Sequence, residues 1–123
     1  MKMRISTEPS SSLLLFDILQ SVEKIDEFTR DISLDQLNTD ERTKDAILRN
    51  LQVIGEASKN LPESLIADHP EVDWSGLAGV RDIITHRYFR VDWNLLWTSI
   101  REELPVLKTQ IRNLMKEDEE SRP

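Results

Sequence analysis

The sequence predicts an all-α fold, an up-and-down bundle of four long helices with one short extra helix. Apolar residues recur along several segments at the spacing of one helix face. The chain has only three glycines and five prolines, too few for a turn-rich all-β domain, and no segment alternates apolar and polar residues as a strand does. Its 123 residues suit one domain with a single core.

The first long helix is predicted from Ser12 to about Arg30. The serines at its start can cap its N-terminus, and residues 1–10 are expected to form a flexible lead. The segment 31–38 is expected to be a connection, and Thr39 is the candidate cap of the next helix. The apolar face of the first helix consists of Leu15, Ile18, Leu19, Val22, Ile25 and Phe28.

The second long helix is predicted to end before Pro62 and to contain a glycine in its interior. Because Gly55 costs about 1 kcal/mol relative to alanine, we expect it to let a neighbouring helix come close, with Ala57 serving the same purpose. Pro62 suits the first turn of the short extra helix, which is predicted over 62–68. The core-facing side of the second helix carries Ile47, Leu51, Ile54, Ser58 and Leu61.

The third long helix is predicted to begin at a cap, either Asp73 or Ser75, and to run through Tyr88. The whole bundle is predicted over 11–115. The apolar stripe of the third long helix consists of Leu77, Val80, Ile83 and Ile84.

The last long helix is predicted from Trp93, after Asp92 as cap, to about residue 115. Its apolar residues step alternately by four and three, a heptad seam that predicts packing along the whole helix. Pro105 interrupts the hydrogen bonding and should kink the helix near Arg101. The acidic segment 116–123 is predicted to be a disordered tail. The seam consists of Trp93, Trp97, Ile100, Leu104, Leu107, Ile111 and Leu114.

The composition excludes several classes of protein. Without cysteine the chain can hold neither a disulfide nor a thiolate-bound metal, and its two histidines lack metal-site spacing, so we expect no metal and no cofactor. No apolar stretch approaches the roughly 20 residues that span a bilayer. The N-terminus does not resemble a signal peptide, and a cytoplasmic protein without membrane contact is predicted. The net charge of −7 argues against broad, non-specific nucleic-acid binding.

One segment departs from this acidic background. Residues 81–90 carry three arginines against one aspartate, together with one of the two histidines and the single tyrosine of the chain. A guanidinium can bind a phosphate, an adjacent carboxylate can orient a neighbouring group, and an imidazole can carry a proton near neutral pH. Arg81, Asp82 and His86 are therefore candidate catalytic residues for cleaving a phosphodiester without a metal.

Helix geometry constrains how these residues can cooperate. Arg81 and His86 lie about 140° apart around the helix and about 7.5 Å apart along it, so one straight helix does not bring both onto one phosphate. Either the helix ends near Thr85 or a second copy of the chain supplies the other half of the site. We favour a two-fold dimer in which these helices face each other. Asp82 and His86, four residues apart, are placed for a carboxylate–imidazole hydrogen bond.

In this segment an arginine precedes a histidine by five positions, a polar residue follows the arginine, and a tyrosine lies two residues after the histidine. This Arg–x4–His–x–Tyr pattern resembles the signature of HEPN-domain proteins, specifically the HepT-like toxins. The resemblance covers about residues 12–115. Its blocks, in the order of that family, are DAILRNLQVIGEAS (45–58), HPEVDW (69–74), GVRDIITHRYFRVD (79–92) and LPVLKTQI (104–111).

This resemblance implies a dimerising HEPN-like bundle that acts as a metal-independent endoribonuclease toxin on RNA, paired with an MNT-type nucleotidyltransferase antitoxin. It implies that His86 exchanges the proton of a ribose 2′-hydroxyl or of the leaving oxygen. Arg81 would hold the phosphate, and Asp82 would orient His86 or the substrate. Tyr88 matches the tyrosine that the antitoxin modifies by AMPylation. The chain departs from the common pattern at Asp82, where the family often has asparagine; a negative charge is unfavourable beside an RNA phosphate.

Other interpretations of the same residues stay open. The candidate catalytic residues can instead form a hydrogen-bond network that holds a dimer, and Tyr88 can be an aromatic residue at the edge of the core. The protein would then be a non-catalytic HEPN dimer that binds a nucleotide or the antitoxin as an interaction module, or a purely structural dimer. Glu56 is expected to pair with a basic residue, Arg81 being a candidate, and His69 is assigned no role. Core or interface anchors are expected at Trp74, Trp93 and Trp97.

Overall fold

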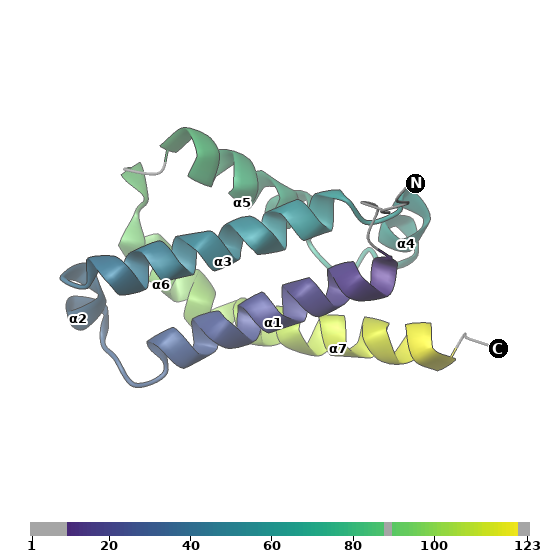
Figure 1. The fold of residues 1–123 in the computed structure, drawn as a ribbon, viewed down its shortest axis with the longest axis horizontal. Coiled ribbons are helices and arrows are strands. Elements are labelled where there is room, and N and C mark those ends of the chain that lie inside the picture. The colour runs from purple at the N-terminus through teal and green to yellow at the C-terminus, as the bar shows by residue number, and fades with distance from the viewer. Residues whose placement is uncertain (1–9, 88–89, 121–123) are drawn as a thin grey trace, which may run out of the picture.

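Within residues 10–87 and 90–120, the part of the chain that the computed structural model describes, the protein consists of seven helices and contains no strand. Figure 1 shows four long rods that alternate in direction, the last of them broken into two successive helices. The predicted all-α, up-and-down fold is therefore confirmed. The helices are α1 (Ser11–Thr29), α2 (Leu34–Asn38), α3 (Glu41–Lys59), α4 (Glu63–Asp68), α5 (Trp74–Arg87), α6 (Trp93–Glu102) and α7 (Leu104–Glu120).

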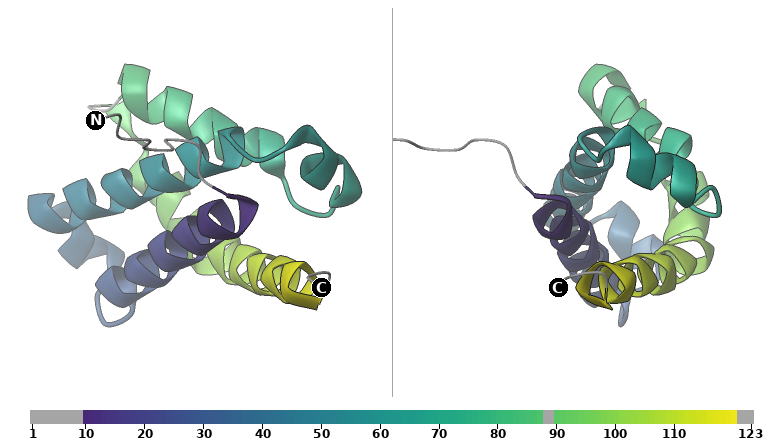
Figure 2. Two further views of the ribbon diagram at one scale, coloured as in Figure 1. Left: turned by 45° about the vertical axis from the view of Figure 1, so that its right-hand side comes forward. Right: turned by 90° about the vertical axis from the view of Figure 1, so that its right-hand side faces the viewer.

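The central helix of the bundle is α3, which packs against α1 on one side and α5 on the other. Helix α7 packs against α1, so that α5 lies on the opposite side of the bundle from α1 and α7 (Figure 2). Among the described side chains, the predicted apolar faces are confirmed except at Phe28, which is 36% exposed; the side chain of Ile83 lies outside the described ones. None of the helices described is long and apolar enough to cross a membrane. Fully buried side chains of the core include Leu15, Ile18, Val22, Ile25, Leu37, Ile47, Ile54 and Ile111.

The segment 31–38 was predicted to be a plain connection, and this prediction was wrong because it contains α2. A capping box begins this helix: the Ser33 hydroxyl accepts the N–H of Gln36 at 3.2 Å, and the Gln36 side chain accepts the N–H of Ser33 at 2.8 Å. Leu37 is fully buried and anchors the turn. The described chain therefore has two short helices instead of one, because a five-residue helix is too short to show apolar periodicity.

The cap of α3 is Asp40 and not the predicted Thr39. The Asp40 carboxylate accepts the backbone N–H of Thr43 at 3.1 Å and its hydroxyl at 2.6 Å. Both hydrogen bonds lower the pKa of Asp40, and the bond from the Thr43 hydroxyl has the larger effect. Thr39 instead closes α2, where its N–H donates to the carbonyl of Gln36.

The predicted kink of the last long helix near Pro105 is confirmed: α6 and α7 are separated only by Glu103, which keeps the αR conformation and donates its N–H to the carbonyl of Ser99 at 2.8 Å. Helix α6 ends at Glu102, and α7 begins at Leu104. Pro105 lies in the first turn of α7, where its lack of an N–H removes no hydrogen bond of that helix. The segment 116–123 was predicted to be disordered, whereas α7 continues to Glu120. Residues 1–9 of the predicted N-terminal lead, and residues 121–123, lie outside the described residues.

Arg101 connects the end of α1 to this last rod. Arg101 of α6 donates from Nη2 to the carbonyl oxygens of Thr29 at 2.7 Å and Ile32 at 3.1 Å, near the C-terminus of α1. Its guanidinium lies over the ring of Trp97, 4.3 Å from the ring centre. A positive group that binds the last carbonyls of a helix is stabilising, because it satisfies acceptors that have no partner within the helix.

Candidate functional site

The loop before α5 determines where that helix begins. The Asp73 carboxylate accepts the N–H of Gly76 at 3.0 Å, which confirms Asp73 rather than Ser75 as the cap. A Cβ on Gly76 would collide with that carboxylate, so a larger residue there would displace the capping group. The indole N–H of Trp74 donates to the carbonyl of His69 at 2.9 Å. These contacts hold the first turn of α5 to the loop.

Helix α5 packs unusually close to α3 at Gly55. A Cβ added to Gly55 would lie 2.9 Å from the Cβ of Arg81, 2.9 Å from the carbonyl oxygen of Leu77 and 3.0 Å from the backbone N of Arg81. The predicted close approach at this glycine is therefore confirmed, and the neighbouring helix is α5. This close approach lies at the position of the candidate phosphate-binding arginine.

Two carboxylates flank Arg81. Its Nε lies 2.5 Å from Oε2 of Glu56 on α3, and its Nη1 lies 3.6 Å from Oδ1 of Asp82, the next residue on α5. The predicted pairing of Glu56 with Arg81 is confirmed. The Arg81 side chain is 36% exposed, so the ion pairs lie at the rim of the α3–α5 interface, accessible to solvent.

Asp82 and His86 are both exposed on the outer side of α5. Their spacing allows a hydrogen bond, but among the contacts of the described residues Asp82 pairs with Arg81 and not with His86. The structure thus brings two of the three predicted catalytic residues together and leaves His86 facing solvent. Tyr88 lies outside the described residues.

The apolar side of α5 anchors the candidate site to the bundle. Ile84 is buried, and Leu77 and Val80 pack partly buried against the core, as the predicted stripe requires. Of α5, only Trp74 and Ile84 are buried among the side chains described. Among the described side chains of this helix, Asp82 and His86 are exposed and accessible to a ligand or another chain.

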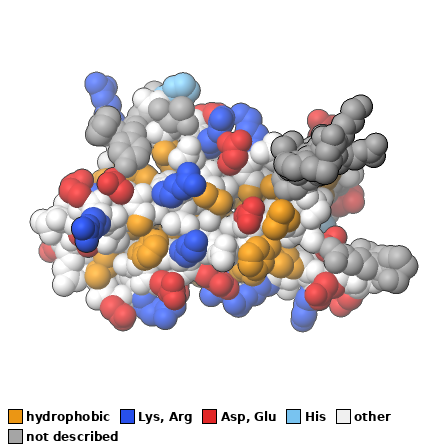
Figure 3. Space-filling model, in the orientation of Figure 1, with side chains coloured by type: hydrophobic (Ala, Val, Ile, Leu, Met, Phe, Trp, Pro, Cys, Tyr) orange, Lys and Arg blue, Asp and Glu red, His pale blue; other side chains and the backbone are white. Residues whose placement is uncertain are grey.

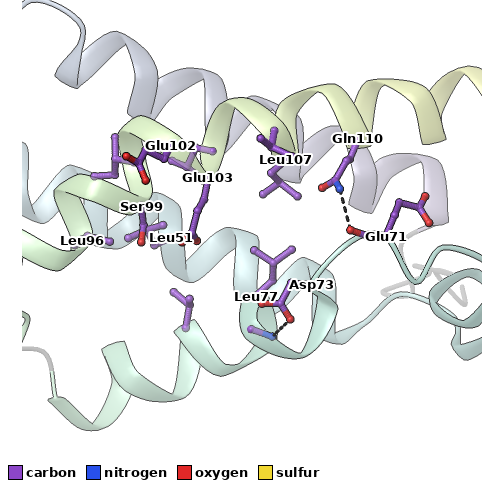
Figure 4. Close-up of a pocket in the computed structure, with 15 residues that line it drawn as sticks. Leu51, Glu71, Asp73, Leu77, Leu96, Ser99, Glu102, Glu103, Leu107 and Gln110 are labelled. Atoms are coloured by element: carbon purple, nitrogen blue, oxygen red, sulfur yellow. Dashed lines mark hydrogen bonds between the residues drawn. The ribbon is translucent and has the colours of Figure 1, made fainter.

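A separate groove of about 480 Å³ lies between α5, α6 and α7 (Figure 4). Its floor is apolar and includes Leu51, Leu77 and Leu107. None of the predicted catalytic residues lines it, and its carboxylates would repel a phosphate. In the described part of the chain, no three His, Asp or Glu side chains come together to hold a metal ion. The acidic residues of the groove are Glu71, Asp73, Glu102 and Glu103.

The family model for ribonuclease HepT-like proteins matches residues 18–114 of the chain. A protein of Thermococcus cleftensis named "Probable ribonuclease HepT" is 42% identical over 102 residues, which are 83% of this chain and 93% of that protein. A candidate RNase of Methanocaldococcus jannaschii is 39% identical over 105 residues, covering 85% of this chain and 87% of that protein. A candidate RNase of Caldanaerobacter subterraneus is 36% identical over 101 residues, which cover 82% of this chain and 90% of that protein. No solved structure matches significantly.

The fold and these matches define a helical protein of the HEPN type. More closely, the chain belongs to the ribonuclease HepT-like family, because the family model spans most of its length and the relatives match nearly end to end.

Proposed function

We propose that this protein is a metal-independent endoribonuclease toxin that works as a homodimer, with Arg81, Asp82 and His86 as its catalytic residues. The observation that carries this proposal is the presence of Arg81 and the exposed His86, five residues apart, on one helix at the edge of the bundle, in a chain of the ribonuclease HepT-like family. The substrate is RNA, whose 2′-hydroxyl supplies the nucleophile.

The reaction needs only groups that this site holds. The ribose 2′-oxygen forms a bond to phosphorus, the bond from phosphorus to the 5′-oxygen breaks, and the nonbridging oxygens gain negative charge. His86 takes the proton of the 2′-hydroxyl or gives one to the leaving 5′-oxygen, and water exchanges the other proton. Arg81 binds the nonbridging oxygens as their charge develops. Asp82, which contacts Arg81 in the free chain, orients that guanidinium or, after turning, His86.

A dimer resolves the separation of Arg81 and His86. Within one helix they point about 140° apart, so one chain does not bring both onto one phosphate. A second copy, related by a two-fold axis, supplies the arginine that the His86 of the first copy lacks. Two features support this arrangement: Asp82 and His86 are exposed, and α5 lies on the outer side of the bundle (Figure 2).

The proposal is tested by incubating the purified chain with RNA in the presence of EDTA. We expect cleavage, and we expect His86→Ala and Arg81→Ala to slow it by at least about 100-fold. Arg112→Ala, at an exposed arginine of α7, is the matched control and should cleave normally. RNA with 2′-deoxyribose at the cut position should resist. Intact RNA after incubation with the wild-type chain would show that the enzyme assignment is wrong.

The shared site has its own test, which mixes the two inactive variants. A mixed dimer of Arg81→Ala with His86→Ala retains one site built from an intact arginine of one chain and an intact histidine of the other. Random exchange should restore roughly a quarter of wild-type activity, since half the dimers are mixed and each has one intact site of two. Absence of any recovery, with exchange verified, would show that each chain works alone.

Control by an antitoxin follows from the family resemblance. In the cytoplasm, an MNT-type nucleotidyltransferase would transfer AMP to Tyr88, and a bulky anion close to Arg81 in sequence would repel the RNA phosphate. Mass spectrometry after co-expression with such an enzyme should show AMP-sized additions to the wild-type chain and none to Tyr88→Phe. Additions that persist in Tyr88→Phe would place the modification elsewhere.

One observation favours a second function, a non-catalytic module that binds a nucleotide or the antitoxin. Glu56 and Asp82 both lie beside Arg81, and two negative charges weaken its attraction for the phosphate of RNA or of a nucleotide, so that the antitoxin is the favoured ligand of such a module. The two functions differ in their outcome on expression alone. A ribonuclease toxin arrests growth and His86→Ala relieves the arrest, whereas a binding module leaves growth and RNA unaffected.

A further inference from the structure

Two consecutive residues of α3 hold Arg81 at two different points. Gly55 admits the α5 backbone, so that the Cβ of Arg81 lies 2.9 Å from where a Gly55 Cβ would be. Glu56 contacts the other end of the same side chain, with Oε2 at 2.5 Å from Nε. The first contact determines where the Arg81 side chain begins, and the second determines which way its guanidinium faces.

We propose that Glu56 is a positioning residue for Arg81 in the RNA-cleaving reaction; this inference rests on the proposed function. A guanidinium has two edges that bind an oxyanion bidentately, one including Nε and one formed by the two terminal nitrogens. Because Nε contacts Glu56, a phosphate held bidentately meets the terminal edge, where it displaces Asp82 from Nη1. Glu56 thereby selects the direction from which the phosphate approaches Arg81.

The exposure of this ion pair indicates that its contribution is geometric. The Arg81 and Glu56 side chains are 36% and 52% exposed, and pairs as open to solvent as this one add little to folding stability. Orientation is different, because a displacement of about 1 Å in a group that binds the reacting phosphate can cost about 100-fold in rate. Glu56 should therefore matter more for turnover than for folding.

The charge of Glu56 acts in the opposite direction on RNA binding. Its carboxylate, like that of Asp82, lies beside the guanidinium and repels an incoming phosphate. Among the described side chains, acidic and basic groups are interleaved over the face that α1, α3 and α5 present (Figure 3), and they form no large cationic surface there. Removing the Glu56 charge should therefore tighten RNA binding while slowing cleavage.

The kinetic test compares Glu56→Gln and Glu56→Ala with wild type on one RNA, measuring kcat and KM, and the dissociation constant for a 2′-deoxy analogue. Glutamine keeps an acceptor for the Nε–H, whereas alanine removes it. We expect kcat to fall a few-fold in Glu56→Gln and on the order of 10- to 100-fold in Glu56→Ala. The dissociation constant should fall or stay constant in both variants. Glu27→Gln, at an exposed glutamate of α1, is the matched charge control and should cleave like wild type.

A second measurement does not depend on activity. The side-chain Nε–Hε signal of Arg81 in a ¹H–¹⁵N spectrum, assigned by its absence in Arg81→Lys, reports the contact with Glu56. It should exchange slowly with solvent in wild type, faster in Glu56→Gln and fastest in Glu56→Ala. Melting temperatures close to wild type would show that the bundle stays folded.

The outcomes separate this inference from the proposed function. If wild type leaves RNA intact, the proposed function and the catalytic positioning fail together, while the Nε–Hε signal still shows whether Glu56 orients Arg81. If wild type cleaves RNA but Glu56→Ala retains its kcat, Glu56 does not position Arg81. A variant that loses kcat, RNA affinity and thermal stability together would also overturn the inference, because that pattern belongs to a structural residue.

Discussion

The two sides of α3 are packed in different ways. Toward α1, both helices contribute fully buried aliphatic side chains, such as Ile18 and Ile54. Toward α5, the closest contact is made at Gly55, and an ion pair lies at the rim. Dense aliphatic packing stabilises the fold, whereas a glycine contact brings two backbones close without covering the side chains beside them. The α1 side therefore holds the bundle together, and the α5 side presents reactive groups to solvent.

The largest expected effect comes from the α1 side. Ile18→Ala removes a side chain with 0% exposure and should lower the free energy of unfolding by about 2–5 kcal/mol. Val80→Ala on α5 removes a partly buried side chain and should cost only about 1 kcal/mol. Urea unfolding followed by circular dichroism measures both changes. Equal losses would mean that α5 is packed as firmly as α1.

Substitutions at two glycines, Gly55 and Gly79, test the packing on the α5 side directly. Gly55→Ala places a methyl group against Arg81 and Leu77 and should cost about 1–3 kcal/mol through overpacking. The same variant should slow RNA cleavage, because α5 and Arg81 move away from Glu56. Gly79→Ala on α5 is the matched control: its Cβ would meet nothing within 4 Å. It should therefore gain up to about 1 kcal/mol from helix propensity. The same change in stability for both variants would contradict the close approach at Gly55.

The smallest effect concerns the cap of α3, the helix that both sides share. Hydrogen bonds from Thr43 lower the pKa of Asp40 below its ordinary value of 3.8. Because the pKa of Asp40 is lower in the folded chain than in the unfolded chain, its charge stabilises the fold at pH values above the unfolded pKa. This stabilisation is lost as the pH falls below 3.8 and passes through the lower pKa of the folded chain. Asp40→Asn keeps the cap without the charge, so its melting temperature should fall less steeply in this acid range. Identical pH profiles for the two proteins would exclude a contribution from Asp40.

The sequence predicted the long helices because apolar periodicity is a local property. It missed α2, whose five residues are too few to show a period, and the end of α7, where an acidic composition concealed a continuing helix. These errors fall at a short element and at a helix end. The kink at Pro105 was predicted correctly, because the missing N–H of a proline is also a local property.

For the candidate site, the sequence by itself determined that Arg81, Asp82 and His86 share one helix, because helix period and motif spacing are properties of neighbouring residues. It also indicated that Gly55 admits another helix and that Glu56 pairs with a basic residue. Only the tertiary structure decided that the helix is α5 and that Asp82 turns to Arg81 rather than to His86. The physical reason is that these residues are far apart along the chain. Glu56 and Arg81 meet only because two antiparallel helices pack at a glycine. The side-chain conformations at such a contact depend on packing and charge in three dimensions.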